Sequence, residues 1–481
     1  MTDVDAVVIG AGPNGLAAAV TLARAGLRVS VYEQAPTIGG GARTAELTLP
    51  GFHHDVCSAV HPMALASEFF QLFGLSRRIE LLLPEVSYGH PLDGGRAGIA
   101  WRDLDRTVDG LGRDGRAWRS LMGPLAARAD EVARFTGDSL LRLPRHPITT
   151  ARFGLRALEQ GSPAWNLRFR EDEAPAMLSG VGAHSILPMP SLSTAGAALS
   201  LGAYAHGHGW PIPVGGSQAI VDAMAADLVE HGGSIQTGVA VESLAQLPRH
   251  RAALFDTTPR ALAAIVDLPD AYRRRLERFR YGNAAAKVDF ALSGPVPWEN
   301  ADLRSAGTVH VGGTRAAIAN SEREVAAGRH PADPYVLVAQ PSILDPGRAP
   351  EGGHVLWAYT HVPAGSSVDP TEAITAQLER FAPGFRDLVL ASSSTTAEQM
   401  ERYNPNYIGG DIAAGAASLR QLLARPVLRP DPWRTPVRGV YLSSSSAAPG
   451  PGVHGLVGWR AALSALRHEF GIAGHSISLG D

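Results

Sequence analysis

The sequence predicts an α/β protein in which a Rossmann-type domain is interleaved with a mixed α+β domain. Two observations lead to this fold class. A strand, a glycine-rich turn, a helix and a second strand follow one another within the first 33 residues. Another buried strand and helix occur at residues 439–470. Both ends of the chain therefore contribute to one nucleotide-type fold, and the second domain lies between them.

The first unit is the most regular. Residues 5–10 form a continuous apolar run, which is typical of a buried parallel strand. Residues 16–25 are rich in alanine and predict a helix that ends at Gly26. Residues 27–33 predict the next strand. Together they indicate a βαβ unit.

The later elements are less regular, and proline and glycine interrupt them. Helical segments fill residues 62–210, among them residues 117–135, and a Gly/Ala-rich apolar run covers residues 180–205. After this run we expect helices at 219–231, 370–381 and 459–470, and strands at 234–241, 252–256, 284–292, 354–361 and 439–443.

These elements predict two discontinuous domains. The Rossmann-type domain would comprise residues 1–61, 210–262 and 430–481. The other domain, which we expect to hold the substrate, would comprise residues 62–209 and 263–429. A chain of 481 residues is too long for one compact core, which agrees with this division.

Composition narrows the function. The net charge of −3 gives no reason to expect a nucleic-acid partner. Cys57 is the single cysteine, which excludes an intrachain disulfide and a cysteine-based zinc site. Any redox chemistry must then reside on a bound cofactor. We find no apolar run of transmembrane length and no signal peptide, so we expect a cytoplasmic protein.

The turn after the first strand fits the dinucleotide-binding pattern. Gly10, Gly12 and Gly15 follow GxGxxG, in which glycines permit the tight turn and the close approach of backbone to pyrophosphate. Pro13 and Asn14 lie in the same loop. Glu33 ends the second strand, at a distance that suits a carboxylate binding ribose hydroxyls.

A second glycine loop favours FAD over NAD. It follows Glu33 closely and contains Gly40, Gly41 and Arg43. Such a loop would wrap the pyrophosphate of a larger ligand, and the arginine would offer a bidentate cation.

Four separated motifs give the chain a resemblance to the FAD-dependent phytoene desaturase-like family of the amine oxidase superfamily. They are the N-terminal fingerprint, the second glycine loop, the segment from Pro213 into the next helix, and residues 439–458. The resemblance implies that Gly452, Val453 and His454 lie near the isoalloxazine ring and Val241 near the adenine. Ser444 stands where the family usually has glycine, which leaves its phosphate contact open.

Two residues are candidates for catalysis. Lys287 is the single lysine among 43 lysines and arginines, and its surroundings resemble the amine oxidase strand whose lysine holds a water against flavin N5. The alternative is an ordinary surface lysine. His454 could act as an acid, base or hydrogen-bond donor, or could merely bond loop backbone.

The substrate side is less well defined. Tyr403, Asn404 and Asn406 resemble a substrate-side loop of the family, although Asn and Pro are also turn formers. His361 could face the substrate or be a core residue. His206 and His208 would share one strand face, but no third ligand is evident, so we expect no metal. Residues 273–280 carry a charge run, either a solvated helix face or a peripheral membrane contact.

The sequence thus predicts an FAD-dependent oxidoreductase with non-covalent FAD. The leading interpretation is a dehydrogenase or desaturase that takes a hydride from a C–H bond of an apolar small molecule, with oxygen or a quinone as electron acceptor and NAD(P)H a poor reductant. The first alternative is a flavin amine oxidase, for which we find no convincing pair of facing tyrosines. The second is a non-catalytic binder of prenyl groups, like the GDP-dissociation inhibitors.

Overall fold

The N-terminal unit folds as expected. The computed structural model describes residues 3–474 and 477–480. In it β1 (Ala6–Ile9), α1 (Pro13–Arg24) and β2 (Val29–Tyr32) follow in order. Proline at the first helical position suits the start of α1, because its missing N–H would have no partner there. The alanine-rich helix is almost wholly buried and packs closely on the sheet.

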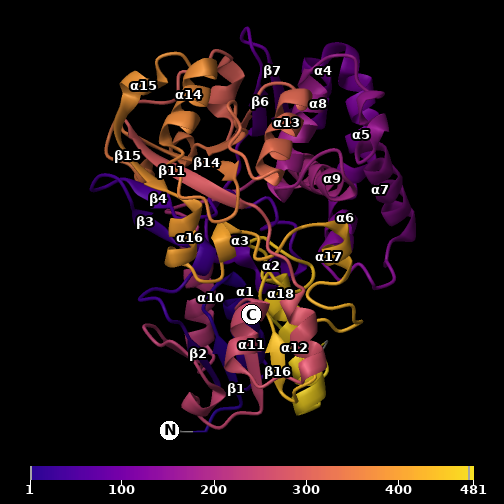
Figure 1. Cartoon of the computed structure of the whole chain (residues 1–481), viewed down its shortest axis with the longest axis vertical. Coiled ribbons are helices and arrows are strands. Elements are labelled where there is room, and N and C mark those ends of the chain that lie inside the picture. Colours follow the sequence, from indigo (N-terminus) through magenta and orange to yellow (C-terminus); the bar gives the residue numbers. More distant parts are fainter. Residues whose placement is uncertain (1–2, 475–476, 481) are drawn as a thin grey trace.

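A five-stranded parallel sheet is assembled from distant parts of the chain, in the order β16-β10-β1-β2-β9. Its later strands are β9 (Ser234–Gln236), β10 (Ala252–Phe255) and β16 (Val440–Leu442). Ile9 pairs with Phe255, so β1 and β10 end at the same edge. This sheet lies at the bottom of Figure 1. The five strands come from residues 6–32, 234–255 and 440–442, all of which fall inside the predicted Rossmann-type domain. The exact boundaries of that domain stay a prediction.

A seven-stranded mixed sheet forms the upper left of the molecule (Figure 1), in the order β15-β11-β14-β13-β12-β6-β7. Its strands are β6 (Val86–Pro91), β7 (Ala97–Trp101), β11 (Ala284–Leu292), β12 (Thr308–Val311), β13 (Val336–Ala339), β14 (His354–Val362) and β15 (Val389–Thr395). One face packs on α14 (Thr371–Phe381) around an apolar core. The other face carries Leu337, Ala339, Trp357 and Tyr359, which belong to a second apolar cluster.

Helices gather beside this sheet at the upper right of Figure 1. They are α4 (Leu104–Gly110), α5 (Gly115–Ala126), α6 (Ala129–Thr136), α7 (Pro147–Gln160), α8 (Glu173–Gly182), α9 (Leu192–Gly207) and α13 (Arg315–Ala326). A separate apolar core joins α5, α6, α8 and α9. No helix in the described ranges is long and apolar enough to cross a membrane.

The remaining elements connect these parts. The helices are α2 (Glu68–Phe73), α3 (Leu75–Arg78), α10 (Gln218–Glu230), α11 (Pro259–Ile265), α12 (Asp270–Glu277), α15 (Phe385–Leu388), α16 (Ala397–Tyr403), α17 (Leu419–Leu423) and α18 (Leu456–Ala465). Two short sheets pair β3 (Thr44–Glu46) with β4 (His53–Asp55), and β5 (Leu81–Leu82) with β8 (Ile212–Pro213).

Three expectations are corrected. Residues 117–135 form parts of two helices, because the chain leaves helical geometry at Arg128. The strand expected at 234–241 ends at Gln236, so Val241 lies in irregular chain. His206 and His208 lie at the end of α9 rather than on a strand. Each contacts a different partner: Trp118 Nε1 donates to His206 Nε2 at 3.2 Å, whereas His208 pairs with Asp130.

Candidate cofactor and substrate site

The glycine-rich turn between β1 and α1 has no room for side chains. Gly10 adopts a φ of +100°, which favours glycine. A Cβ on Gly15 would lie 2.1 Å from the carbonyl oxygen of Gly10. Gly10, Gly12, Pro13 and Asn14 line a large cavity, and Gly15 packs behind them. Because α1 begins here, its first N–H groups and its positive end can face an anion in that cavity.

Asp256 is a site residue that sequence analysis did not assign. It directly follows β10, and its Oδ2 accepts a hydrogen bond from the N–H of Gly15 at 2.9 Å. Burial, assisted by the nearby charge of Glu33, raises the pKa of Asp256 to about 7. The signal available in the sequence was an acidic residue immediately after a short apolar strand. In the structure that strand, β10, ends beside β1, which brings Asp256 to the glycine turn.

Glu33 and Arg43 brace the cavity wall. Glu33 accepts hydrogen bonds from the N–H groups of Ala11 and Ala35, both at 2.8 Å, and it lines the cavity. Arg43 donates to the carbonyl oxygens of Ile38 and Thr37. The guanidinium therefore holds the second glycine loop in shape, and it also lines the cavity.

The second glycine loop meets the first one. Gly40 has a φ of +53°, and a Cβ there would lie 3.1 Å from the Cα of Gly12. Gly40 and Gly41 both line the cavity. The glycines of both loops thus expose backbone to the same cavity, as binding of a pyrophosphate requires.

The C-terminal loop contributes Ser444, Gly452 and Val453 to the cavity wall. Ser444 Oγ donates to the carbonyl oxygen of Thr257 at 2.5 Å, so it ties this loop to the end of β10. Val241 also lines the cavity. His454 is buried and does not line it: Nδ1 accepts from the N–H of Leu456, and Nε2 lies 3.2 Å from the carbonyl oxygen of Gly450. This arrangement matches the second interpretation of His454, a residue that bonds loop backbone.

Lys287 is buried on β11 and is not a surface lysine. Its Nζ donates to the carbonyl oxygens of Asp55 and Val56, at 2.9 and 2.7 Å. It also lies 2.9 Å from Asp289 Oδ2. These three acceptors match the three N–H donors of an ammonium group. Lys287 does not line the cavity, but Cys57, the next residue after those carbonyls, does. A role beside flavin N5 stays a prediction.

The predicted substrate residues lie in different places. Tyr403, Asn404 and Asn406 line the cavity. Arg43 donates to Tyr403 Oη at 3.0 Å, and Asn406 Oδ1 accepts from the N–H of Thr258 at 2.9 Å. These contacts place the loop beside the glycine turns. His361 does not line the cavity, because it is buried with Nδ1 2.6 Å from Glu322 Oε1.

The cavity has a volume of about 860 Å³ and extends well beyond the glycine loops. Its far part is walled by α7, α9 and strands of the seven-stranded sheet. The residues of α9 that line it are Leu192, Ser193, Gly196, Ala197, Ser200, Leu201 and Tyr204. Leu158 of α7 lines the cavity and is 56% exposed, so the cavity reaches the surface there. Part of the Gly/Ala-rich run is therefore cavity wall, and other parts, such as Val181 and Leu199, are core.

His184 was also missed by sequence analysis. It lines the cavity, and its Nε2 lies 2.8 Å from Nε2 of His310. Burial lowers the pKa of His184 to about 3 and also lowers that of His310, so both rings are neutral and one donates to the other. Nothing in the local sequence distinguishes this histidine, because the pairing joins residues 126 positions apart.

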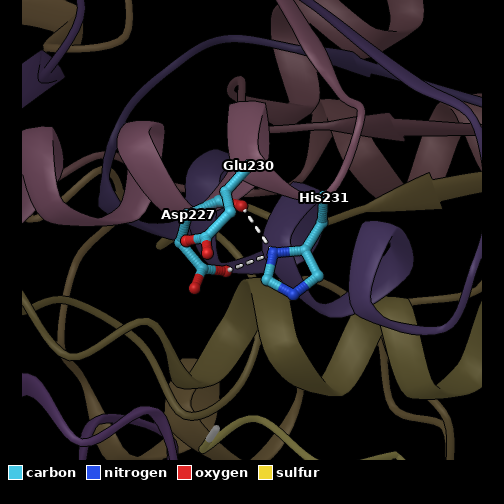
Figure 2. Close-up of side chains that lie close together, drawn as sticks. All are labelled: Asp227, Glu230 and His231. Atoms are coloured by element: carbon cyan, nitrogen blue, oxygen red, sulfur yellow. Dashed lines mark hydrogen bonds and ion pairs between the residues drawn. The ribbon is translucent and has the colours of Figure 1, made fainter.

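A separate cluster, Asp227, Glu230 and His231, has ligand atoms close enough to share a metal ion (Figure 2). However, Asp227 also accepts from Arg24 Nη2 at 2.6 Å and pairs with Arg78 at 3.1 Å. Its negative charge is thus already compensated, and we propose no metal site there.

Fold and site together define a class of protein: an oxidoreductase that binds a flavin nucleotide. The chain belongs to the flavin-containing amine oxidoreductase family, whose sequence profile matches residues 14–462. This agrees with the resemblance found in the four motifs.

Particular relatives are similar to the chain at low identity. The rat pyridine nucleotide-disulfide oxidoreductase domain-containing protein 2 is 26% identical, over 96% of this chain and 93% of its own. A lycopene-forming phytoene desaturase of Pseudescherichia vulneris is 26% identical over 96% and 99%. A 4,4'-diapolycopen-4-al dehydrogenase of Metabacillus indicus is 29% identical over 26% of this chain and 26% of its own.

Solved structures show the same fold. A putrescine oxidase variant superposes with a TM-score of 0.60 at 17% identity, covering 96% of this chain and 98% of its own. The cyclohexylamine oxidase of Brevibacterium oxydans gives 0.59 at 18% identity, covering 99% of both. The expected Rossmann-type fold is confirmed.

The residues present fit a flavin nucleotide. Two glycine-rich loops and the start of α1 form a cradle for phosphates. Glu33 offers carboxylate oxygens at the end of β2. Asn14 lines the cavity, and its buried Oδ1 has no hydrogen-bond partner among the described residues. The family, the cradle and the cavity all point to a flavin cofactor.

Proposed function

We propose that the chain is an FAD-dependent dehydrogenase or desaturase acting on a C–H bond of an elongated, apolar small molecule. The observation that carries this proposal is the continuity of the cavity. It runs from the glycine loops, past Gly452 and Val453, to the gap between α7 and α9. Most of its far wall is aliphatic or small. A molecule in this gap would be shielded from water over most of its length, up to the opening at Leu158.

The cofactor in this proposal is non-covalently bound FAD. The first N–H groups of α1 would hold its pyrophosphate, Glu33 its ribose hydroxyls, and Val241 its adenine. Bound FAD supplies a two-electron acceptor for a hydride from carbon, and oxygen or a quinone would reoxidise it. The chain itself orients the substrate and excludes water. Lys287 fixes the backbone of Asp55 and Val56 beside the cavity-lining Cys57.

A second candidate, an amine oxidase, has one observation in its favour. Tyr359, Tyr407 and Trp357 all line the cavity, so aromatic side chains that the sequence did not pair do face one space. Against it, the acids in the described cavity wall are Glu33, Asp138 and Asp256. Two of these lie at the glycine turn, and Asp138 pairs with Arg460 and Arg142. A protonated amine would find no free carboxylate beside the aromatic side chains.

The test compares reductants of the purified, FAD-loaded protein under anaerobic conditions. Phytoene and 4,4'-diapolycopenal in detergent represent apolar substrates, and putrescine and cyclohexylamine represent amines. We expect the flavin absorbance to bleach with an apolar probe and not with the amines or with stoichiometric NADPH. Bleaching by an amine alone would favour the second candidate. Flavin that stays with the protein after acid precipitation would contradict non-covalent binding.

A further inference from the structure

The inner floor of the cavity is one face of the seven-stranded sheet. Thr308 on β12, Ala339 on β13 and Trp357 on β14 lie directly across from one another, and all three line the cavity. Residues that alternate with them, such as Val309 and Val338, belong to the core under α14. Since side chains alternate between the faces of a sheet, Thr308 and Trp357 are directed to the cavity side.

Both of these residues carry a polar atom without a partner. Thr308 is 1% exposed and Trp357 is 6% exposed. Among the described residues, neither Thr308 Oγ1 nor Trp357 Nε1 has a hydrogen-bond partner. Leaving a buried donor unsatisfied destabilises the folded state. Two residues of one cavity floor, on β12 and β14, therefore hold hydrogen-bond donors that the protein itself does not use.

The opposite wall contains two glycines that the fold does not require. Gly154 lies within α7 and Gly196 within α9, and both line the cavity. A Cβ added to either would meet nothing within 4 Å. Glycine inside a helix is less favourable than alanine, so these two positions lower the stability of the fold without a packing reason.

Another glycine on the same helix behaves differently. A Cβ on Gly202 would lie 2.5 Å from Met122 Cε, and Gly202 does not line the cavity. Close helix packing explains Gly202 and does not explain Gly154 or Gly196. Space for a ligand is the remaining role for those two.

We propose that the cavity binds a substrate with an elongated apolar body between α7 and α9 and a neutral hydrogen-bond acceptor, a carbonyl or hydroxyl oxygen, at its inner end. Thr308 and Trp357 would donate to that oxygen, and Gly154 and Gly196 would set the width available to the body. This inference rests on the proposed function and narrows its substrate class.

We infer a neutral acceptor because, among the described residues, the nearby cations Lys287 and Arg43 already have partners. The centroid of the Trp357 ring is 5.7 Å from Lys287 Nζ, but Lys287 already pairs with Asp289. Arg43 is bound within the second glycine loop. A carboxylate placed against Trp357 would therefore lose its hydration without gaining a counter-ion.

Binding can be tested without turnover. The FAD-loaded protein is titrated with 2-tridecanone, tridecane and tridecanoic acid, and affinity is read from thermal stabilisation and tryptophan fluorescence. We expect the ketone to bind more tightly than the alkane and the acid. Trp357→Phe and Thr308→Val should each weaken ketone binding about three- to tenfold and leave alkane binding unchanged, the size expected for one hydrogen bond.

The glycines have a matched control. Gly196→Leu and Gly154→Leu should abolish binding of ketone and alkane alike while the flavin spectrum is kept. Gly196→Ala should raise the melting temperature, because it removes only the cost of a helical glycine. Gly202→Ala should lower the melting temperature and leave the ratio of ketone to alkane affinity unchanged.

Several outcomes would overturn the inference: equal affinity for ketone and alkane in the wild type, tighter binding of the acid, no binding of any probe, or unaltered binding in both leucine variants. The proposed function fails separately. A protein that binds the ketone through Trp357 but is reduced only by putrescine keeps the binding inference and contradicts the dehydrogenase. A protein that is reduced by phytoene but binds ketone and alkane equally keeps the dehydrogenase proposal and contradicts the binding inference.

Discussion

The carboxyl group of Asp256 accepts a hydrogen bond from the N–H of Gly15 across 2.9 Å, so an ionisable group lies directly beneath the glycine-rich turn. Burial raises the pKa of Asp256 to about 7. The N–H groups of this turn are those that a pyrophosphate would use. The protonation state of Asp256 should therefore govern how well an anion binds there.

We expect the affinity of the apoprotein for FAD to fall as the pH rises through about 7, because ionised Asp256 repels the pyrophosphate. The decrease can reach about tenfold per pH unit if the complex keeps the proton. Asp256→Asn should flatten the dependence, since it is neutral throughout. Fluorescence titration of apoprotein with FAD measures this, and parallel pH profiles for the two proteins would contradict it.

The same carboxyl sets a trend in stability. Its pKa is about 7 in the folded state against 3.8 for an ordinary aspartate. Between these values the folded state holds a proton that the unfolded state has lost, so the free energy of unfolding should fall as the pH rises. Denaturant unfolding of apoprotein at several pH values should show this contribution in the wild type and not in Asp256→Asn. A steeper fall in the variant would refute the assignment.

A paired substitution tests the packing beneath the turn. A Cβ on Gly12 would lie 2.5 Å from Asp256 Oδ2. We expect Gly12→Ala to lose FAD binding and Gly12→Ala/Asp256→Ala to recover part of it. Gly15→Ala is the control, since its Cβ would meet the backbone oxygen of Gly10 and no side-chain truncation can relieve that. Flavin content after reconstitution is the measurement; a double variant as empty as Gly12→Ala would show that the space belongs to the pyrophosphate.

Lys287 and Asp289 should behave as a pair. Lys287→Met leaves a buried carboxylate without its cation, which typically costs about 3–5 kcal/mol. Lys287→Met/Asp289→Asn should recover most of that loss in denaturant unfolding of the apoprotein. Lys287→Arg should not substitute, because a guanidinium is larger and flat. A Lys287→Met protein as stable as the wild type would show that the pair contributes nothing.

The double variant also separates the two roles considered for Lys287. It removes the amine while restoring stability, and FAD should remain bound. A fall in the rate of anaerobic flavin reduction by orders of magnitude, followed by stopped-flow absorbance, is the result expected for an amine acting beside N5. An almost unchanged rate would leave Lys287 as a residue that positions the Asp55–Val56 backbone.

Glu33 offers a milder test. It accepts from the N–H groups of Ala11 and Ala35, one on each carboxylate oxygen. Glu33→Gln keeps one acceptor and turns the other into a donor, so FAD binding should weaken by a few kcal/mol at most. Isothermal titration of apoprotein measures it, and an undiminished affinity would exclude Glu33 from the ribose site.

The parts of the site that local sequence determines were predictable. The βαβ unit, the two glycine loops and Glu33 all lie within the first 43 residues. Their geometry follows from the glycines of the turns and from the pattern of apolar residues in the strands and the helix. Residues 284–292 were assigned to a strand with the observed bounds. Lys287 and Asp289 could also have been paired, since positions i and i+2 of a strand face the same side.

Long-range pairing determines the rest. Asp256 reaches the glycine turn because β10 pairs with β1, which no local pattern states. His361, for which the substrate side and the core were both considered, meets Glu322 of α13, a contact that depends on how a distant helix docks. Thr308 and Trp357 lie on the same cavity floor only because β12, β13 and β14 pair in register.

The five-stranded sheet also constrains when the protein can mature during synthesis. β1 and β2 leave the ribosome first, β10 emerges more than two hundred residues later, and β16 follows only at Val440. Until then the edge of β10 is open and the loop carrying Gly452 and Val453 does not exist. Nascent chains must expose an unpaired strand edge for most of translation, a stage at which chaperones protect aggregation-prone chains. FAD added during translation should thus do little for yield, whereas FAD present at release should capture the newly completed sheet.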